Sequence, residues 1–369
     1  MSGIYIHVPF CKSKCTYCDF ASYPKETGKI ESYFACLYRE LEGRGRAAGG
    51  KTFDTVYIGG GTPSFVDEKF IVGALRQVRK FFTLSNDPEI TIEINPGTLT
   101  PEKVKAYKSV GINRFSIGLQ TGYDDQLKKL NRIHTAKDFL LAAGMLKGEN
   151  ISADVLIGLS GQTAEQVRKT IDLALAGGAK HLSVYALTPE PGTPIYTDYL
   201  NGELLSEDEV ADIYDDIRAY LGEKGIKRYE VSNFAYPGYE SRHNLNYWRR
   251  GEYIGAGVSA SSFWQGRRFT NSYSIDEYMN AVIYNKMPEI SSEVIEKDDA
   301  EFEFIMLGLR TAEGISVKEF NDCFGEDFDK KYKRALTKKG AYLVREGDRL
   351  KIKDEYLYVQ NDILLEFMG

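Results

Sequence analysis

The most constraining feature of this sequence is a regular alternation, over its first half, of short apolar segments with segments of helical spacing. Six apolar segments have the length of a strand, and glycine, cysteine or polar residues follow them. They lie at residues 3–8, 55–58, 90–94, 114–118, 151–157 and 181–186. Apolar strands separated by helices predict a parallel sheet covered by helices. A parallel barrel and a doubly wound sheet share this local pattern, so both are compatible with it.

Three cysteines lie close together directly after the first predicted strand. Cys11, Cys15 and Cys18 have the spacing C-x3-C-x2-C, which can bring three thiolates to one metal centre. Three thiolates suit a [4Fe–4S] cluster that keeps one iron open for a small ligand. A structural zinc site would need a fourth Cys or His, but Cys36 falls on the next predicted helix and His7 lies inside the strand. Zinc therefore ranks second.

Glycine and acidic residues mark the later strands. Residues 59–64, Gly-Gly-Gly-Thr-Pro-Ser, follow the second strand and would let the backbone approach a ligand, although tight turns also use glycine. Glu93 and Asp154 stand on strands that are otherwise apolar. A buried carboxylate needs a partner. A polar ligand at the carboxyl ends of the strands would provide one.

These segments together resemble the radical S-adenosylmethionine (SAM) superfamily. The resemblance rests on the three cysteines, on Tyr-x-His-x-Pro-Phe-Cys before them, on Tyr-Cys-Asp-Phe at their end and on Gly-Gly-Gly-Thr-Pro, and the matching order spans about residues 3–265. It implies an α/β fold with a three-quarter, TIM-like (β/α)6 barrel, a [4Fe–4S] cluster on Cys11, Cys15 and Cys18, and SAM at the open iron. It also implies SAM contacts from Tyr5, Gly60, Gly61, Thr62, Glu93, Gln120, Arg132, Asp154, Ala186 and Ser261.

Within the superfamily the chain is similar to the subgroup of oxygen-independent coproporphyrinogen III oxidase and the HemW heme chaperones, and closest to the latter. The oxidase pattern has a fourth cysteine after the third, with one residue between them, whereas Asp19 and Phe20 follow Cys18 here. The first strand also begins at about residue 3, without the N-terminal extension of the oxidase.

A later segment carries the motif that the chaperones are associated with. Residues 243–248, His-Asn-Leu-Asn-Tyr-Trp, match the HNxxYW motif linked to heme binding. The resemblance implies that His243 is an axial ligand and that Tyr247 and Trp248 flank the porphyrin. We therefore expect a protein that binds heme and delivers it, rather than an enzyme. The alternative is the oxidase, which performs SAM-dependent oxidative decarboxylation of propionate side chains.

Composition limits the compartment and the partners. The 369 residues carry a net charge of −6, which argues against a nucleic-acid-binding surface. The sequence has no apolar run of 18 residues and a strand almost directly after Met1, so we expect a cytoplasmic protein with no transmembrane segment; peripheral membrane association stays compatible. Five cysteines in this length do not form a disulfide framework. The implied partners are heme, heme-accepting proteins and an electron donor, and the chain is a monomer or a heme-linked dimer.

The rest of the sequence predicts a second, smaller domain. We place the radical SAM barrel core and the following HNxxYW segment at residues 1–265, a polar connecting segment at 266–297 and a C-terminal domain at 298–369. Three helical patterns and a short hairpin in the last region predict an α+β domain of winged helix-like order. The acidic composition favours a protein-contact or lid role for it over DNA binding.

Overall fold

The computed structural model describes residues 1–368, and its centre is a sheet of twelve strands in the order β12-β11-β10-β9-β1-β2-β3-β4-β5-β6-β8-β7. The six strands predicted from the sequence are parallel and adjacent in chain order: β1 (Ser2–Val8), β2 (Thr52–Gly60), β3 (Thr83–Ile94), β4 (Arg114–Gln120), β5 (Asn150–Ile157) and β6 (His181–Ala186). A doubly wound sheet reverses its strand order at a switch point, whereas this order runs on without reversal. The predicted incomplete barrel is therefore confirmed.

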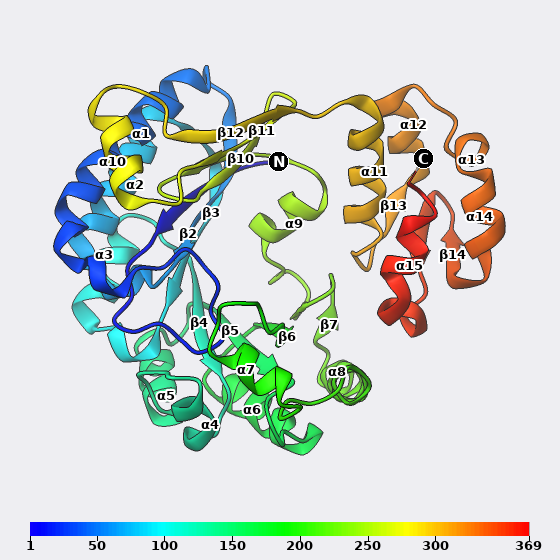
Figure 1. Cartoon of the computed structure of the whole chain (residues 1–369), viewed down its shortest axis with the longest axis horizontal. Helices are drawn as coiled ribbons and strands as arrows, with labels where there is room; N and C mark the ends of the chain where they lie inside the picture. The colour runs from blue at the N-terminus through cyan, green and yellow to red at the C-terminus, as the bar shows by residue number, and fades with distance from the viewer. Residues whose placement is uncertain (369) are drawn as a thin grey trace.

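Helices cover one face of the parallel strands, as Figure 1 shows. They are α1 (Ile30–Ala47), α2 (Glu68–Phe81), α3 (Pro101–Ser109), α4 (Asp124–Lys129), α5 (Ala136–Met145), α6 (Ala164–Ala176) and α8 (Glu207–Glu223). Several begin at a side-chain cap; Thr100 Oγ1, for example, accepts a hydrogen bond from the backbone N–H of Lys103 at the start of α3. Alternate residues of β1, among them Ile4 and Ile6, are fully buried in the core under these helices.

Helix α1 continues through a Gly-Arg-Gly-Arg stretch, residues 43–46, to Ala47, although glycine disfavours the interior of a helix. Two contacts explain this. The buried Arg44 donates to Glu40 Oε1 over 2.7 Å, and at Gly45 the helix packs so closely on Phe81 that a Cβ atom would lie 2.7 Å from the Phe81 Cβ. Glycine is used here for close packing rather than for a turn.

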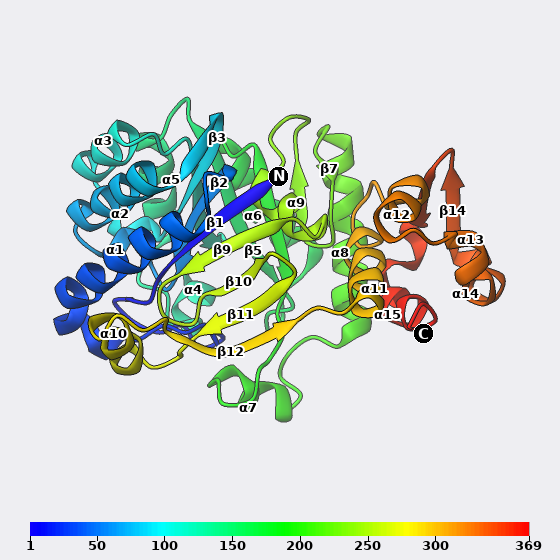
Figure 2. The same cartoon turned by 90° about the horizontal axis from the view of Figure 1, so that it is seen from above.

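The segment 266–297 differs from the expected connection between domains. After β9 (Glu252–Ala256), which is parallel to β1, the chain adds the antiparallel strands β10 (Ser261–Trp264), β11 (Arg267–Asn271) and β12 (Glu289–Val294), with α10 (Ile275–Ile283) between the last two (Figure 2). Strand β12 is an edge strand and is largely exposed. An edge strand can carry charged residues on both faces, so its sequence is hard to distinguish from that of a linker.

The C-terminal unit has its own aromatic core, with Phe320 and Phe328 fully buried. Its helices are α11 (Lys297–Gly308), α12 (Val317–Phe324), α13 (Phe328–Lys331), α14 (Lys333–Lys339) and α15 (Gln360–Leu365). A three-stranded sheet joins β13 (Ile315–Ser316), β15 (Arg349–Ile352) and β14 (Leu343–Glu346) in that order. The predicted hairpin is β14–β15, and the predicted third helix is divided into α13 and α14.

Smaller elements join the two units. They are α7 (Ile195–Leu200), β7 (Lys227–Arg228), β8 (Asn233–Ala235) and α9 (Arg242–Trp248). Strand β8 pairs with β6 and closes the parallel series on that side. Helix α9 lies between the sheet and α11 of the C-terminal unit (Figure 1). Single 3-10 turns occur at Pro24–Lys29, Pro63–Phe65, Pro96–Thr98, Gly340–Tyr342 and Asp354–Val359.

Candidate functional site

The three cysteines lie on the loop after β1 and face one cavity of about 400 Å3 at the carboxyl ends of the strands. Two of their sulfur atoms accept hydrogen bonds from cavity residues. Thr62 Oγ1 donates to Cys11 Sγ over 3.4 Å, and Arg132 Nη1 donates to Cys15 Sγ over 3.5 Å. The loop is anchored where the backbone N–H of Thr16 donates to the carbonyl of Leu130 over 3.2 Å. All three are free thiols.

This arrangement fits an iron–sulfur cluster better than a single ion. Among residues 1–368, no three His, Cys, Asp or Glu side chains are placed to hold one metal ion. A cluster is a larger body than an ion and spreads its sulfur ligands around itself. Thiolates that surround a shared cavity meet this requirement, as does a donor set made of sulfur alone.

The structure brings most of the predicted SAM contacts together in the cavity of the cysteines. The residues that line it are Gly60, Gly61, Thr62, Glu93, Gln120, Arg132, Asp154 and Ala186. Most come from the end of a strand or the loop after it, whereas Asp154 lies in the middle of β5 and Arg132 follows α4. The parallel register places the strand ends at one edge of the barrel. The remaining two, Tyr5 and Ser261, line a neighbouring cavity instead.

Glu93 connects the glycine-rich turn to the barrel interior. Its carboxylate accepts from Tyr57 Oη at 2.8 Å and from the backbone N–H of Gly60 at 3.1 Å. Burial raises the pKa of Glu93 to about 7, and the nearby carboxylate of Asp154 adds to the rise, although the two hydrogen bonds oppose it. This carboxyl group therefore titrates near neutral pH, and a cationic group in the cavity would favour its charged form.

Besides Glu93, the cavity wall carries a second acidic group, Asp154, and a basic group, Arg132. Asp154 accepts from Ser116 Oγ at 3.3 Å, and burial raises the pKa of its carboxyl group. Arg132 donates to the carbonyl of Gly118 at 2.9 Å, but its Nε is buried and has no hydrogen-bond partner within the described chain. The backbone of Gln120 has a φ of 69°, a value that residues other than glycine rarely adopt. Unpaired polar atoms and backbone strain of this kind are typical of ligand sites.

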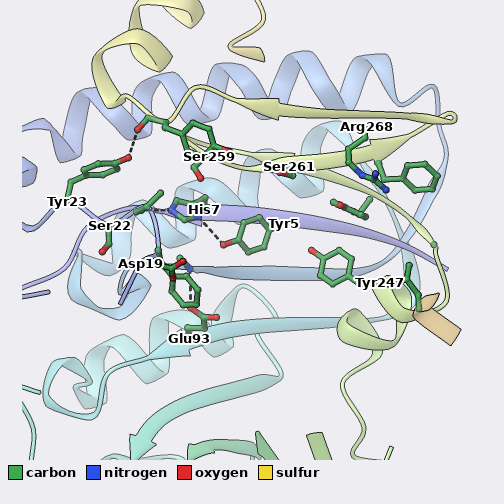
Figure 3. A pocket seen from close by; sticks show the side chains of 18 of the residues that line it. Tyr5, His7, Asp19, Ser22, Tyr23, Glu93, Tyr247, Ser259, Ser261 and Arg268 are labelled. Atoms are coloured by element: carbon green, nitrogen blue, oxygen red, sulfur yellow. Dashed lines mark hydrogen bonds between the residues drawn. The ribbon is translucent and has the colours of Figure 1, made fainter. Parts of the chain in front are cut away.

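A second and larger cavity, of about 830 Å3, adjoins the first (Figure 3). Glu93 and Gly60 line both, so the two cavities share a wall. Its other walls are β1, the β9–β11 extension, α9 and α11, and tyrosine side chains are frequent among them. Phe20, which stands where the oxidase pattern has its fourth cysteine, lies on this cavity together with Asp19.

His7 and Tyr5 form the floor of the larger cavity (Figure 3). His7 Nε2 lies 2.8 Å from the carbonyl of Ala21, which can only accept, so this nitrogen carries the proton. His7 Nδ1 then accepts from Tyr5 Oη at 3.0 Å. Burial lowers the pKa of His7 to about 4, which keeps the ring neutral. The pair fixes the direction of the Tyr5 phenol at the cavity wall.

The residues of the predicted heme segment do not all lie on the larger cavity. His243 is buried, and both ring nitrogens are engaged: Nδ1 lies 2.7 Å from Thr55 Oγ1 and Nε2 lies 2.8 Å from Tyr247 Oη. Burial lowers the pKa of His243 to about 3. An axial ligand needs a free nitrogen directed at iron, so the expected ligand role of His243 disagrees with this arrangement. Tyr247 lines the larger cavity, whereas Trp248 is not among its wall residues.

Three residues of the larger cavity, His7, Arg250 and Arg268, are not among the site residues predicted from the sequence. The strand period offers a signal for His7, because Tyr5 and His7 alternate with the fully buried Ile4, Ile6 and Val8 and so share the interior face. The two arginines are brought together by tertiary structure alone.

Family comparisons agree with the sequence motifs. A family model described as the radical SAM superfamily matches residues 5–174, and a model described as the HemN C-terminal domain matches residues 295–356. The resemblance that the cysteine and glycine motifs indicated is therefore confirmed.

Individual relatives extend the match over nearly the whole chain. The chain is 34% identical over 335 residues to a protein of Bacillus subtilis (strain 168) named heme chaperone HemW, covering 89% of this chain and 88% of the relative. A protein of the same name from Lactococcus lactis is 33% identical over 374 residues, covering 100% and 97%. A third, from Escherichia coli (strain K12), is 34% identical and covers 86% and 85%.

Among solved structures, the chain resembles coproporphyrinogen III oxidase (HemN) from Escherichia coli, described as a radical SAM enzyme. The TM-score is 0.87 over 100% of this chain and 90% of that one, with 19% sequence identity. At this identity the likeness supports the fold. The family is shown by the three relatives, because the chain is at least 33% identical to each of them over most of both lengths. The chain belongs to the HemW family within the radical SAM superfamily.

Proposed function

We propose that this protein binds heme and delivers it to heme-accepting proteins, on a scaffold that holds a [4Fe–4S] cluster and SAM. The observation that carries the proposal is the similarity, over 85% or more of the length of each, to three proteins named heme chaperone HemW. The two adjoining cavities support it, because they offer separate places for the cluster with SAM and for a larger ligand.

In this proposal Cys11, Cys15 and Cys18 hold the cluster, whose open iron binds the amino and carboxylate groups of SAM. The chain contributes position and charge. Glu93 and Asp154 supply the negative charge that a sulfonium or ammonium group needs, while Arg132 supplies a donor for a carboxylate. Gly60, Gly61 and Thr62 let the backbone approach the ligand, and Gln120 and Ala186 complete the wall.

The larger cavity is the proposed place for heme. Its volume of about 830 Å3 lies within the range of cofactor sites. The phenol rings of Tyr5 and Tyr247 and the benzyl ring of Phe263 provide flat apolar surface against which a porphyrin can stack. His243 contributes indirectly, because its Nε2 fixes the hydroxyl of Tyr247. Tyr5 and Ser261, both on this wall, are the two SAM contacts of the resemblance that this placement puts nearer to heme.

The proposal includes an acceptor protein and an electron donor, and it treats the chain as a monomer or a heme-linked dimer. No helix within residues 1–368 combines the length and the apolar character needed to cross a membrane. Catalytic decarboxylation is not part of the proposal, because Phe20 occupies the place of the fourth cysteine in the oxidase pattern.

The proposal is tested by titrating ferric heme into the anaerobically reconstituted protein and following its absorption spectrum. We expect saturable binding of one heme per chain, with transfer to an added heme-free acceptor. The Cys15→Ser variant distinguishes heme binding in the larger cavity from cluster binding in the smaller one, because it should lose the cluster and still bind heme. Heme that partitions without saturation into both proteins would contradict the proposal.

A further inference from the structure

The wall of the larger cavity contains a cluster of two arginines and one glutamate from three separate elements. Arg250 follows α9, Arg268 lies on β11, and Glu303 lies on α11 of the C-terminal unit. Arg250 Nε donates to Glu303 Oε2 over 2.8 Å, and Arg268 Nη2 donates to Glu303 Oε1 over 2.7 Å. One carboxylate therefore bridges two guanidinium groups, with 13% of the Glu303 side chain exposed.

Both guanidinium groups are held against one aromatic ring. The Cζ of Arg250 lies 4.7 Å from the centre of the Phe263 ring, and that of Arg268 lies 5.8 Å from it. Stacking of this kind orients the planar donor fork of arginine before any anion arrives. The pair is thus built as a carboxylate site, because guanidinium forks match carboxylate oxygens in geometry.

The backbone at Arg250 supports the same conclusion. Helix α9 ends with the backbone N–H of Gly251 donating to the carbonyl of Asn246, and Arg250 has a φ of 53° at the left-handed position of this turn. Glycine is the residue that fits this position without strain. An arginine is disfavoured there by its backbone, which points to a use for its side chain.

We infer that Arg250 and Arg268 bind a propionate carboxylate of the porphyrin and that Glu303 occupies their place in the absence of ligand. The inference rests on the proposed heme function and adds the residues that recognise the acidic edge of heme. It also gives the C-terminal unit a role. Loading of heme displaces Glu303 and so releases one of the contacts that hold α11 against the barrel.

The charge of the cluster favours replacement of Glu303 by a propionate carboxylate. Two guanidinium groups face one carboxylate of the chain, and the other acid in contact, Glu293, has 63% of its side chain exposed and lies 3.4 Å from Arg268. Because solvent screens the exposed Glu293, the buried part of the cluster keeps a net positive charge, which attracts a further carboxylate. Leu307, one helical turn after Glu303, is an apolar wall residue on the same face of α11, so movement of this helix would change the cavity along its length.

A matched control lies next to the cluster. Arg249 Nη2 pairs with Glu313 Oε2 over 3.0 Å, and this pair also connects the end of α9 to the C-terminal unit. Its side chains are 46% and 59% exposed, and neither lines the cavity. The Glu313→Gln variant therefore removes an ion pair between the same two units without touching the proposed ligand site.

The test measures the affinity of the full-length protein for iron-free mesoporphyrin IX, followed by its fluorescence, and for the dimethyl ester of the same porphyrin. Wild type should prefer the free acid by about tenfold or more, as expected for a charge-assisted contact. Arg268→Gln should lose most of this preference, whereas Glu303→Gln should bind the free acid roughly three- to tenfold more tightly than wild type, since the competing carboxylate is gone. Glu313→Gln should match wild type.

Hydrogen exchange gives a second measurement that does not depend on porphyrin fluorescence. Addition of heme to wild type should increase amide exchange in α11, and Glu303→Gln should show that increase before heme is added. Equal affinity of wild type for acid and ester, or unchanged or weaker binding by Glu303→Gln in a protein with wild-type circular dichroism, would overturn the inference while leaving heme binding itself intact. Absence of any heme binding by wild type would overturn the proposed function, and the inference with it.

Discussion

Replacement of Glu93 by glutamine should make the cluster-free protein more stable at alkaline pH. Glu93 is half-buried at the wall shared by both cavities, and burial raises its pKa from 4.5 to about 7. Because the pKa in the folded state lies above that in the unfolded state, the folded protein holds this proton more tightly. The contribution to stability is therefore complete below about pH 4.5 and is lost as the pH rises through about 7.

The magnitude follows from the two pKa values. A difference between 4.5 and about 7 corresponds to a loss of roughly 3 kcal/mol of folding free energy between acidic and alkaline pH. Water in the adjoining cavities reduces the cost of the charge, so we expect about 1–2 kcal/mol. Glutamine removes the charge and still accepts from Tyr57, but it leaves the N–H of Gly60 without its acceptor, which offsets part of the gain.

The assay is urea denaturation of the cluster-free protein at intervals from pH 5 to pH 8.5. The difference in unfolding free energy between Glu93→Gln and wild type should move in favour of the variant as the pH rises. Glu165→Gln, an exposed substitution on α6, is the control. Parallel curves for wild type and Glu93→Gln would refute the raised pKa, as would a growing loss of stability in the variant above pH 7.

Further substitutions test three separate parts of the site. Cys15→Ser should remove the [4Fe–4S] cluster, whereas Cys36→Ser should leave the iron and sulfide content unchanged; comparable loss in both would contradict a cluster held by the loop cysteines alone. Asp154→Ala should weaken SAM binding, measured by calorimetry, by roughly ten- to a hundredfold, as expected for one charged hydrogen bond, and unchanged affinity in a folded variant would remove Asp154 from the site. His243→Ala should destabilise the protein by about 2–4 kcal/mol, because it removes a buried ring and two hydrogen bonds. Tyr247→Phe keeps the ring and should perturb the heme absorption band with a smaller loss of stability; a normal band in both variants would separate this segment from heme.

Much of the fold could be predicted from the sequence because each parallel strand has a recognisable local sequence pattern. A strand that is buried on both sides is a continuous apolar run, and its carboxyl end is marked by the residues that face the ligand cavity. The cysteine loop and the glycine turn after β2 were found in this way, and the structure places both at the same edge. The order of the strands in the sheet came from the family resemblance, since the local pattern also fits a doubly wound sheet.

Features that depend on distant contacts could not be predicted in the same way. Strand β12 carries polar residues on both faces because it lies at the edge of the sheet, so it was assigned to a connecting segment. His243 was expected to offer a free imidazole, but Thr55, far away in the chain, occupies one of its nitrogens. The pairing of Arg268 with Glu303 joins two elements whose proximity no local pattern records.

The most direct test of the central claim is a single anaerobic experiment on the reconstituted protein. The protein is supplied with SAM, a low-potential reductant and coproporphyrinogen III, and porphyrin products and carbon dioxide are measured; a parallel sample is titrated with ferric heme. We predict one bound heme per chain, transfer to a heme-free acceptor, and no carbon dioxide above the level of the Cys15→Ser variant. Steady, SAM-dependent release of carbon dioxide with formation of protoporphyrinogen IX would contradict the account and make this protein a decarboxylase.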